Sequence, residues 1–391
     1  MYREFYLWAS SSLHMSAKVM KRVRERLADK IANFNEVVYE EILRESIMDK
    51  HVMERFRKFP YNKEDIYEKE LLMKKMNVSY ITIDDSDYPE KLKEIYDPPY
   101  ILYYMGNIEL LKDISFAVVG SRKATDYGKN VAKIIVSDLA EKGFVIVSGM
   151  ARGIDSCAHN FCMKAQMPTI AVMGTSIEKS YPKGSVKLKK EIIESGGLVL
   201  SEYFIGAKTE AVYFAMRNRI ISALSEGVLV VEAAEKSGAL ITVDCALQQN
   251  RNVYAIPGSI FSENSRACNN IISEGAKLVQ KSEDILEDFE SILYNKILLN
   301  KNNNKKIYKN SGKTTSTCVN IRFDDIDREN ISKEEIFIIK ILQSKGVLDI
   351  DELSVITRYE LTDLIYYVNK LILKGFVVEA GFNRYAPNII R

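Results

Sequence analysis

Glycine, serine and basic residues follow several short apolar runs in the middle of this 391-residue chain. The first such turn comes after FAVVG and contains Gly120, Ser121 and Arg122. Backbone N–H groups in a tight strand-to-helix turn can face an anion, and a guanidinium can bind a phosphate through two hydrogen bonds. Taken alone, this turn is equally typical of an ordinary connection with a surface arginine.

Similar candidate phosphate ligands occupy the same position relative to later runs. They are Ser148, Gly149, Arg152 and Gly153 in one turn, Lys183 in another, Arg217 and Arg219 on the helical stretch FAMRNRIISALS, and Ser237 and Gly238 before ALIT. Because so many turns have the same composition, the sequence predicts one anion-binding pocket formed where they converge. No nucleophile is paired with a base, so we expect binding without catalysis.

Three common cofactor and metal signatures are absent or incomplete. The chain has no GxGxxG and no acidic residue after the second run, which argues against a dinucleotide cofactor. Cys157, His159 and Cys162 share one helical stretch and lack a fourth ligand, so packing is favoured over zinc. The GKTT at 312–315 lacks the first glycine of a P-loop and a preceding strand. We therefore expect neither cofactor nor metal.

The elements that position these turns alternate between short apolar runs and helical stretches. The runs cover residues 116–120, 144–149, 169–174, 198–202, 227–233, 252–258 and 276–280. Continuous apolar strands separated by helices are typical of a parallel sheet covered on both faces. The predicted fold class is therefore α/β, with a Rossmann-like, doubly wound, mostly parallel sheet that binds ligands at its carboxyl edge.

The flanking segments predict smaller domains. Residues 1–77 are expected to form a helical N-terminal domain, in which the many Lys and Arg residues are more typical of a solvated face than of a binding one. Residues 78–292 form the extended Rossmann-like domain, and residues 293–329 a flexible, lysine- and asparagine-rich linker. The order of helices and strands in 330–391 predicts a winged helix, a module that binds either DNA or protein.

Composition narrows the class of protein. The chain is 47% hydrophobic and 28% charged with a formal net charge of +2, which is typical of a globular protein and gives no global signal of nucleic-acid binding. Five irregularly spaced cysteines argue against a disulfide framework. The N-terminus lacks the apolar region of a signal peptide, and no apolar run is long enough to span a bilayer. We expect a cytoplasmic protein without a membrane partner.

The succession VVGSR, VSGMARGIDSCAH, TIAVMG, LVLSE, FAMRNRIISALSEGVLVVEAAEKSGALIT and YAIPG, in this order across roughly residues 78–290, resembles the DprA/Smf family (DNA-processing protein A). The resemblance implies a protein that binds and protects single-stranded DNA entering during natural transformation. It also implies that the protein loads the RecA recombinase and forms a homodimer through its Rossmann-like domain. The implied DNA-phosphate pocket contains Gly120, Ser121, Arg122, Arg152, Lys183, Arg217 and Arg219.

Two other readings remain open. Rossmann-like phosphoribohydrolases share the arginine-rich helix before a strand, but their chemistry needs a PGGxGTxxE loop with a catalytic glutamate. Here the matching stretch, residues 232–242, keeps Glu232 and Glu235 and lacks the PGG and the later glutamate. The other reading is a nucleotide sensor without catalysis. Four aromatic residues near the strand ends fit either base stacking or core packing: Tyr181, Phe204, Tyr213 and Phe214.

Overall fold

The computed structural model describes residues 2–289, 332–374, 376–379 and 384–387. They form two compact units, one within residues 1–282 and the other within 283–391. The predicted linker at 293–329 lies outside the described residues, and the finer domain boundaries remain predictions. No helix in the described ranges combines the length and the apolar character that crossing a membrane requires.

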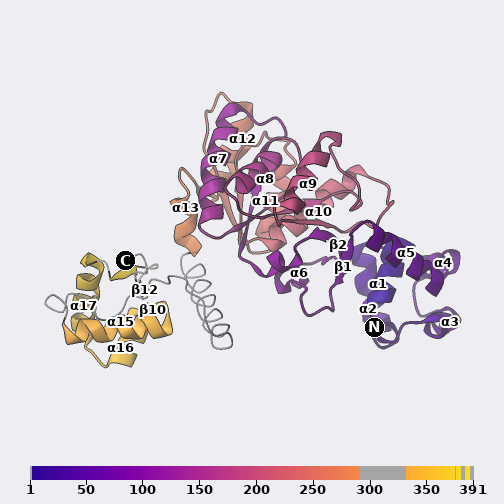
Figure 1. The fold of residues 1–391 in the computed structure, drawn as a ribbon, viewed down its shortest axis with the longest axis horizontal. Coiled ribbons are helices and arrows are strands. Elements are labelled where there is room, and N and C mark those ends of the chain that lie inside the picture. Colours follow the sequence, from indigo (N-terminus) through magenta and orange to yellow (C-terminus); the bar gives the residue numbers. More distant parts are fainter. Residues whose placement is uncertain (1, 290–331, 375, 380–383, 388–391) are drawn as a thin grey trace, which may run out of the picture. The chain divides into compact units, whose positions relative to one another are not determined.

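Five helices form one end of the first unit (Figure 1). They are α1 (Tyr2–Ser11), α2 (Ala17–Ala32), α3 (Glu36–Glu45), α4 (Lys50–Lys58) and α5 (Lys63–Lys75). Trp8 is fully buried at their centre, with the rings of Phe34, Tyr39 and Phe56 around it. Ser16 and Asn62 cap the N-termini of α2 and α5 with their side-chain oxygens. This aromatic core explains why a segment so rich in charged residues folds.

A nine-stranded sheet forms the rest of this unit, in the order β1-β2-β6-β5-β4-β3-β7-β8-β9. The strands are β1 (Ser79–Thr82), β2 (Ile101–Gly106), β3 (Ser115–Val119), β4 (Val145–Ser148), β5 (Thr169–Met173), β6 (Leu198–Ser201), β7 (Gly227–Val230), β8 (Asn252–Ala255) and β9 (Lys277–Leu278). Strands β3 to β9 match the seven predicted runs and pair in parallel. The predicted α/β fold is therefore confirmed. The sequence did not indicate β1 and β2, which extend the sheet through antiparallel pairing.

Helices and short turns connect the strands, and those from α7 to α12 join the parallel ones. They are α6 (Glu90–Lys93), α7 (Asp126–Glu141), α8 (Ile154–Lys164), α9 (Val186–Glu194), α10 (Ala211–Leu224), α11 (Ala239–Gln248) and α12 (Glu263–Ser273), with short 3₁₀ turns at Ile108–Lys112 and Lys183–Ser185. Helix α8 packs against α7 and α9, whereas α10 packs against α11. Because such crossovers are right-handed, the two groups cover opposite faces of the sheet. Strands β3 to β7 are fully buried between them.

The direction of the chain through the sheet reverses at β3. From β3 the chain adds β4, β5 and β6 on one side, and it returns to add β7 and β8 on the other. The connections leaving β3 and β7 therefore diverge to opposite faces and leave a crevice at their carboxyl ends. Open α/β sheets bind their ligands at such a switch point.

The second unit is small. It contains α13 (Glu283–Leu286), a 3₁₀ turn (Glu287–Phe289), α15 (Lys333–Lys345), β10 (Leu348–Asp349), α16 (Ile350–Thr357), α17 (Leu361–Leu373), β11 (Val377–Glu379) and β12 (Arg384–Pro387). Capping boxes begin α15 at Ser332 and α16 at Asp349. The order of elements agrees with the predicted winged helix, but the segment between β11 and β12 lies outside the described residues. The winged-helix assignment stays a prediction.

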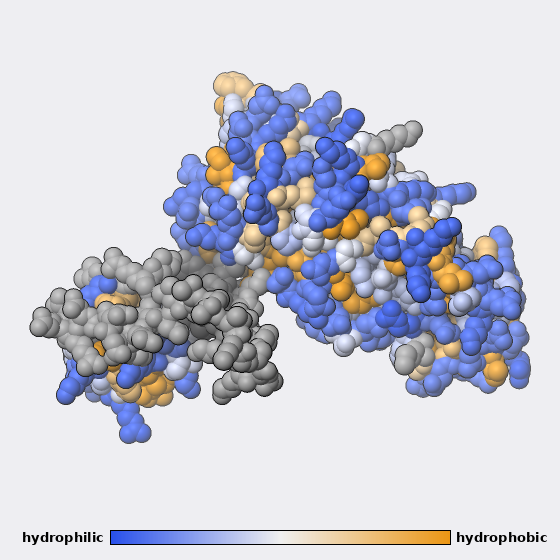
Figure 2. All heavy atoms as spheres, viewed as in Figure 1, coloured by the Kyte–Doolittle hydropathy of each residue, from blue (hydrophilic) through white to orange (hydrophobic). Residues whose placement is uncertain are grey.

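On the face shown in Figure 2, hydrophilic residues cover most of the described surface and apolar residues form small patches. Scattered apolar side chains are normal on a folded protein. A functional site is therefore better sought in a pocket than in a broad apolar surface.

Candidate functional site

A pocket of about 570 Å³ lies at the switch point of the sheet. Its walls come from the segments after β3, β4 and β7 and from α10, α11 and α12. Six of the predicted ligands line it: Gly120, Ser121, Arg122, Arg217, Ser237 and Gly238. Residues far apart in sequence thus meet here because the carboxyl ends of parallel strands share one edge.

The rim of the pocket carries three exposed cations, Arg122, Lys123 and Lys236. Ser121 fixes the backbone of the turn that carries the first two, because its N–H donates to the carbonyl oxygen of Glu232 at 2.6 Å. The Ser121 hydroxyl oxygen also accepts from the Lys123 N–H at 3.1 Å. Within the described ranges, none of the ion pairs involves these three cations. They therefore remain available to an anion.

Arg217 forms part of the floor of the pocket and is only 5% exposed. Its Nη1 donates to the carbonyl oxygens of Gly149, at 2.7 Å, and Val172, while its Nε donates to Asn218 Oδ1 at 3.1 Å. Burial lowers the pKa of Arg217 to about 10, against the attraction of Asp155, so the guanidinium is charged at neutral pH. It joins the ends of β4 and β5 and places positive charge beneath the rim.

At two positions near the pocket, neighbouring atoms lie too close to the backbone for any residue except glycine. A Cβ at Gly149 would overlap the guanidinium of Arg217, and a Cβ at Gly153 would overlap the carbonyl oxygen of Ser121. Gly153 also has a φ of +83°, which side chains disfavour. These glycines shape the pocket by letting its walls approach each other.

Two helices at the pocket have a glycine at the N-cap position. Helix α8 begins after Gly153 and α11 after Gly238, and neither glycine can supply a capping oxygen. Helix α7 differs, because the Thr125 hydroxyl accepts from the Gly128 N–H. The first N–H groups of α8 and α11 already have partners: Ile154 donates to Ser121 O at 3.2 Å, and Ala239 donates to Ser237 Oγ at 3.3 Å. What both helices offer an anion in the pocket is the positive end of the helix dipole.

Glu232 supports the N-cap of α7 and does not line the pocket. It is 2% exposed, and its carboxylate accepts from the backbone N–H of Thr125 at 2.9 Å and from the Thr125 hydroxyl. Asp155 is the buried carboxylate that does line the pocket; it accepts from the N–H groups of Gly149 and Ala151 at 3.2 and 3.4 Å. Burial raises the pKa of Asp155, while the nearby charge of Arg217 opposes that shift. Both carboxylates therefore have structural partners.

Four predicted ligands have other surroundings. Arg219 is 5% exposed and pairs with Glu202 at 2.7 Å and Asp97 at 2.9 Å, so its charge is already neutralised away from the pocket. The Ser148 hydroxyl is fully buried and donates to Val118 O at 2.6 Å. Arg152 is exposed outside the lining. The backbone of Lys183 lies in a 3₁₀ turn, and its side chain is outside the described part.

Sequence reasoning did not single out several lining residues. Lys123 and Lys236 adjoin predicted ligands, so their position in the same turns was an available signal. Asn218 also lies between two predicted ligands, and its amide donates to Gly238 O at 3.2 Å. Asn264 had no such signal, and its amide donates to Lys123 O at 2.9 Å. Only the fold brings the Asn264 amide to the pocket.

The aromatic residues near the strand ends have different roles. Phe214 lines the pocket, and the half-exposed ring of Tyr181 lies 4.8 Å from it. Tyr213 stacks on Tyr203 with a centroid separation of 4.0 Å, and Phe204 is 7% exposed within the core. Phe214, with Tyr181 packed beside it, is thus the aromatic residue at the pocket.

A family model described as DNA recombination-mediator protein A matches residues 79–290, which include the whole pocket. The chain belongs to this family. It is 43% identical over 245 residues to the DNA processing protein DprA of Streptococcus pneumoniae (strain ATCC BAA-255 / R6), covering 62% of this chain and 79% of the relative. It is 38% identical over 237 residues to Protein Smf of Escherichia coli (strain K12), covering 61% and 63%.

Comparison of the fold with solved structures indicates the same family. The X-ray structure of DNA processing protein A from Streptococcus pneumoniae superposes with a TM-score of 0.63 and 36% identity, covering 73% of this chain and 96% of that one. The chain therefore shares its fold with a solved structure of this family. The predicted DprA/Smf family is confirmed.

Proposed function

We propose that this protein binds single-stranded DNA at the switch-point pocket, as expected of a DNA-processing protein acting in transformation. The observation that carries the proposal is the clustering of Arg122, Lys123 and Lys236 on the rim, above the buried charge of Arg217. Membership of the recombination-mediator family supports DNA as the ligand. Because the formal net charge is only +2, attraction to a polyanion must come mainly from such local clustering.

Each part of the pocket has a role in this proposal. The rim cations bind backbone phosphates, and the positive dipole end of α11 adds to the attraction for the same anions. Phe214 and Tyr181 offer rings on which an unpaired base can stack. A flexible single strand can place a phosphate and a base in a pocket of about 570 Å³ at the same time, whereas paired bases in a duplex are not free to do so.

Binding is proposed to occur without turnover. The glutamate that a phosphoribohydrolase reading would retain, Glu232, caps α7 instead of facing the pocket. Incubation with AMP-type nucleotides should release no free base. Protein-dependent release of base above background would favour the hydrolase reading.

The partner and the assembly are also proposals. The family description as a recombination mediator supports transfer of the bound strand to the RecA recombinase in the cytoplasm. A homodimer through the Rossmann-like domain is supported by exposed apolar side chains near α11 and α12, where Leu247 is 60%, Ile260 75% and Phe261 90% exposed. Sedimentation velocity of the wild type and of Leu247→Glu tests the dimer: a wild-type monomer at micromolar concentration contradicts it.

A fluorescence-anisotropy titration tests the main proposal. A labelled oligothymidine and a hairpin duplex of equal charge are each titrated with the full chain at several salt concentrations. We expect tighter binding to the single strand and a linear fall of log affinity with log salt. Equal affinity for both, or no binding to the single strand, contradicts the proposal.

A further inference from the structure

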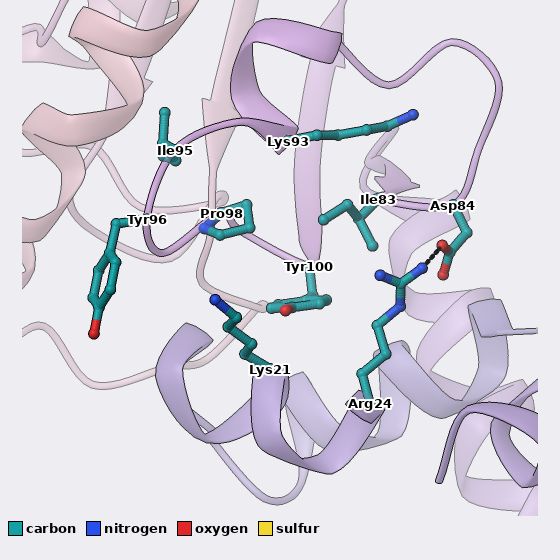
Figure 3. A pocket seen from close by; sticks show the side chains of 9 residues that line it. All are labelled: Lys21, Arg24, Ile83, Asp84, Lys93, Ile95, Tyr96, Pro98 and Tyr100. Atoms are coloured by element: carbon teal, nitrogen blue, oxygen red, sulfur yellow. Dashed lines mark hydrogen bonds and ion pairs between the residues drawn. The ribbon is translucent and has the colours of Figure 1, made fainter. Parts of the chain in front are cut away.

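A second pocket, of about 430 Å³, lies where helices α1 to α5, here called the helical front, meet β1 and β2 (Figure 3). Its walls are α2, the segment after β1, and the loop between α6 and β2. Two tyrosines, three cations and one carboxylate supply its polar and aromatic groups: Tyr96, Tyr100, Lys21, Arg24, Lys93 and Asp84. Lys21 and Arg24 extend from α2 on one side, and Lys93 lies on the opposite side (Figure 3).

One cation belongs to the frame of this pocket. Arg24 pairs with Asp84, which also accepts from the Tyr6 hydroxyl at 2.8 Å. The same carboxylate thus joins α1 and α2 to the segment after β1. Neighbouring Asp85 pairs with Arg3 at 2.6 Å and reinforces this junction. The helical front is therefore fixed against the sheet at this site.

The other two cations are available to a ligand. Lys93 pairs with Glu90 at 2.7 Å on its own short helix, and exposed pairs of this kind contribute little. Lys21 is exposed, and within residues 2–289 no carboxylate forms an ion pair with it. Its ammonium lies 5.7 Å from the ring centroid of Tyr96. A phosphate between Lys21 and Lys93 would find two charges with weak competing partners.

Tyr96 presents an aromatic face on an anchored loop. Its side chain is 79% exposed, although the next residue, Asp97, is held by Arg219 through an ion pair of 2.9 Å. Such anchoring reduces the entropy lost when a planar ligand stacks on the ring. Arg219 lies on α10 two residues beyond Arg217, which lines the switch-point pocket. One helix therefore fixes elements of both pockets in a single frame.

We propose that this second pocket binds one nucleotide unit of single-stranded DNA, with the base on Tyr96 and the phosphate between Lys21 and Lys93. The proposal rests on the proposed function and extends the DNA path to the helical front. Stacking on an exposed ring combined with backbone phosphate contacts is how proteins hold single strands without reading their sequence. The pocket volume lies in the range of small-ligand sites.

Substitutions at Tyr96 test the stacking contact. In anisotropy titrations with a long oligothymidine, Tyr96→Ala should weaken binding by roughly five- to a hundred-fold, the effect of removing one stacked base. Tyr96→Phe keeps the ring and should bind like the wild type. An alanine variant with wild-type affinity overturns the proposal, as does an equal loss in the phenylalanine variant.

Substitution of Lys21 tests the phosphate contact. Lys21→Ala should lower affinity and reduce the slope of log affinity against log salt by about 0.7. Arg22→Ala is the matched control, because Arg22 pairs with Asp49 at 3.1 Å and does not line the pocket. The proposal is wrong if the Lys21 and Arg22 variants have the same salt slope.

Two further measurements separate the possible sources of the nucleotide and the two proposals. Thymidine monophosphate is titrated alone: if Tyr96→Ala loses this ligand but keeps the strand, the pocket is a free-nucleotide site and the proposal fails. An oligonucleotide carrying 5-iododeoxyuridine should photocrosslink to the tryptic peptide 94–112, which contains Tyr96.

Absence of strand binding by the wild type refutes the proposed function itself. Wild-type binding that is weakened by Arg122→Ala but not by Tyr96→Ala refutes only the second pocket.

Discussion

Gly149 lies directly against the guanidinium of Arg217, whose Nη1 donates to the Gly149 carbonyl oxygen at 2.7 Å. No side chain fits between them, because even a Cβ would overlap the guanidinium. The absence of a side chain at one residue thus lets the ends of β4 and β5 share one buried charge.

Replacement of this glycine should disturb both stability and binding. Gly149→Ala should lower the free energy of unfolding by about 1 to 3 kcal/mol, the usual effect of overpacking, and weaken single-strand binding by displacing Arg217. Urea unfolding and anisotropy titrations measure the two effects. Gly184→Ala is the control, since a Cβ there meets nothing within 4 Å. Equal stability of the two variants would show that Arg217 moves aside without cost.

Arg122 should contribute to binding and not to folding. A charge-assisted contact with one phosphate is worth about 1.5 to 3 kcal/mol, so Arg122→Ala should weaken single-strand binding by roughly ten-fold to over a hundred-fold. The salt slope should flatten by about 0.7. Arg122→Lys should keep the slope and lose part of the affinity, because lysine lacks the guanidinium fork.

The matched control for Arg122 is Arg266→Ala, which removes an exposed arginine outside the pocket. Titrations of the four proteins at several salt concentrations compare them. If the Arg122 and Arg266 variants bind equally well, Arg122 is an ordinary surface residue.

Arg219, unlike Arg122, should contribute to folding and not to binding. It lies only two residues from Arg217 in the sequence. Arg219→Ala leaves the carboxylates of Glu202 and Asp97 without their partner, so the free energy of unfolding should fall by roughly 3 kcal/mol. That figure is the low end of the range because a third of the Asp97 side chain is exposed. The folded fraction should keep its affinity at the switch-point pocket. A variant with wild-type stability and weak DNA binding would instead support the prediction from the sequence that Arg219 contacts a phosphate.

His159 should make stability depend on pH. Thr169 Oγ1 donates to the Ile146 carbonyl at 2.6 Å, so it accepts from His159 Nδ1–H at 2.9 Å and leaves Nε2 unprotonated. Burial, aided by the charge of Arg217, lowers the pKa of His159 to about 3 from an ordinary value of 6.5. Because the unfolded chain takes up this proton first, stability is retained above pH 6.5 and lost as pH falls toward 3.

Between pH 7 and pH 5 this loss should be about 2 kcal/mol. Urea unfolding of the wild type and of His159→Gln at both pH values isolates it, since the other titrating groups are common to both proteins. The variant should lose less stability than the wild type over this interval. Identical pH dependence would mean that His159 takes up a proton as readily in the native state as in the unfolded chain.

The sequence by itself determined the sheet and the location of the ligand edge. Continuous apolar runs such as those leading to Gly120 and Gly149 cannot remain in water, so they form strands buried on both faces, and helices must lie between them. Their shared direction places all the turns at one edge. The position of the phosphate-type residues after the strands therefore predicted a pocket at this edge before any contact was known.

Only the tertiary structure decided which side chains face that pocket. Arg217 and Arg219 look equivalent in sequence, but residues two apart on a helix point in different directions, so one lines the pocket and the other meets two carboxylates. Asp97 precedes Arg219 by more than a hundred residues, and no local pattern connects them. Long-range packing also brings α2 against the loop of Tyr96 and creates the second pocket. Strand propensity and periodicity are local properties, whereas the pairing of charges depends on which surfaces the folded chain brings together.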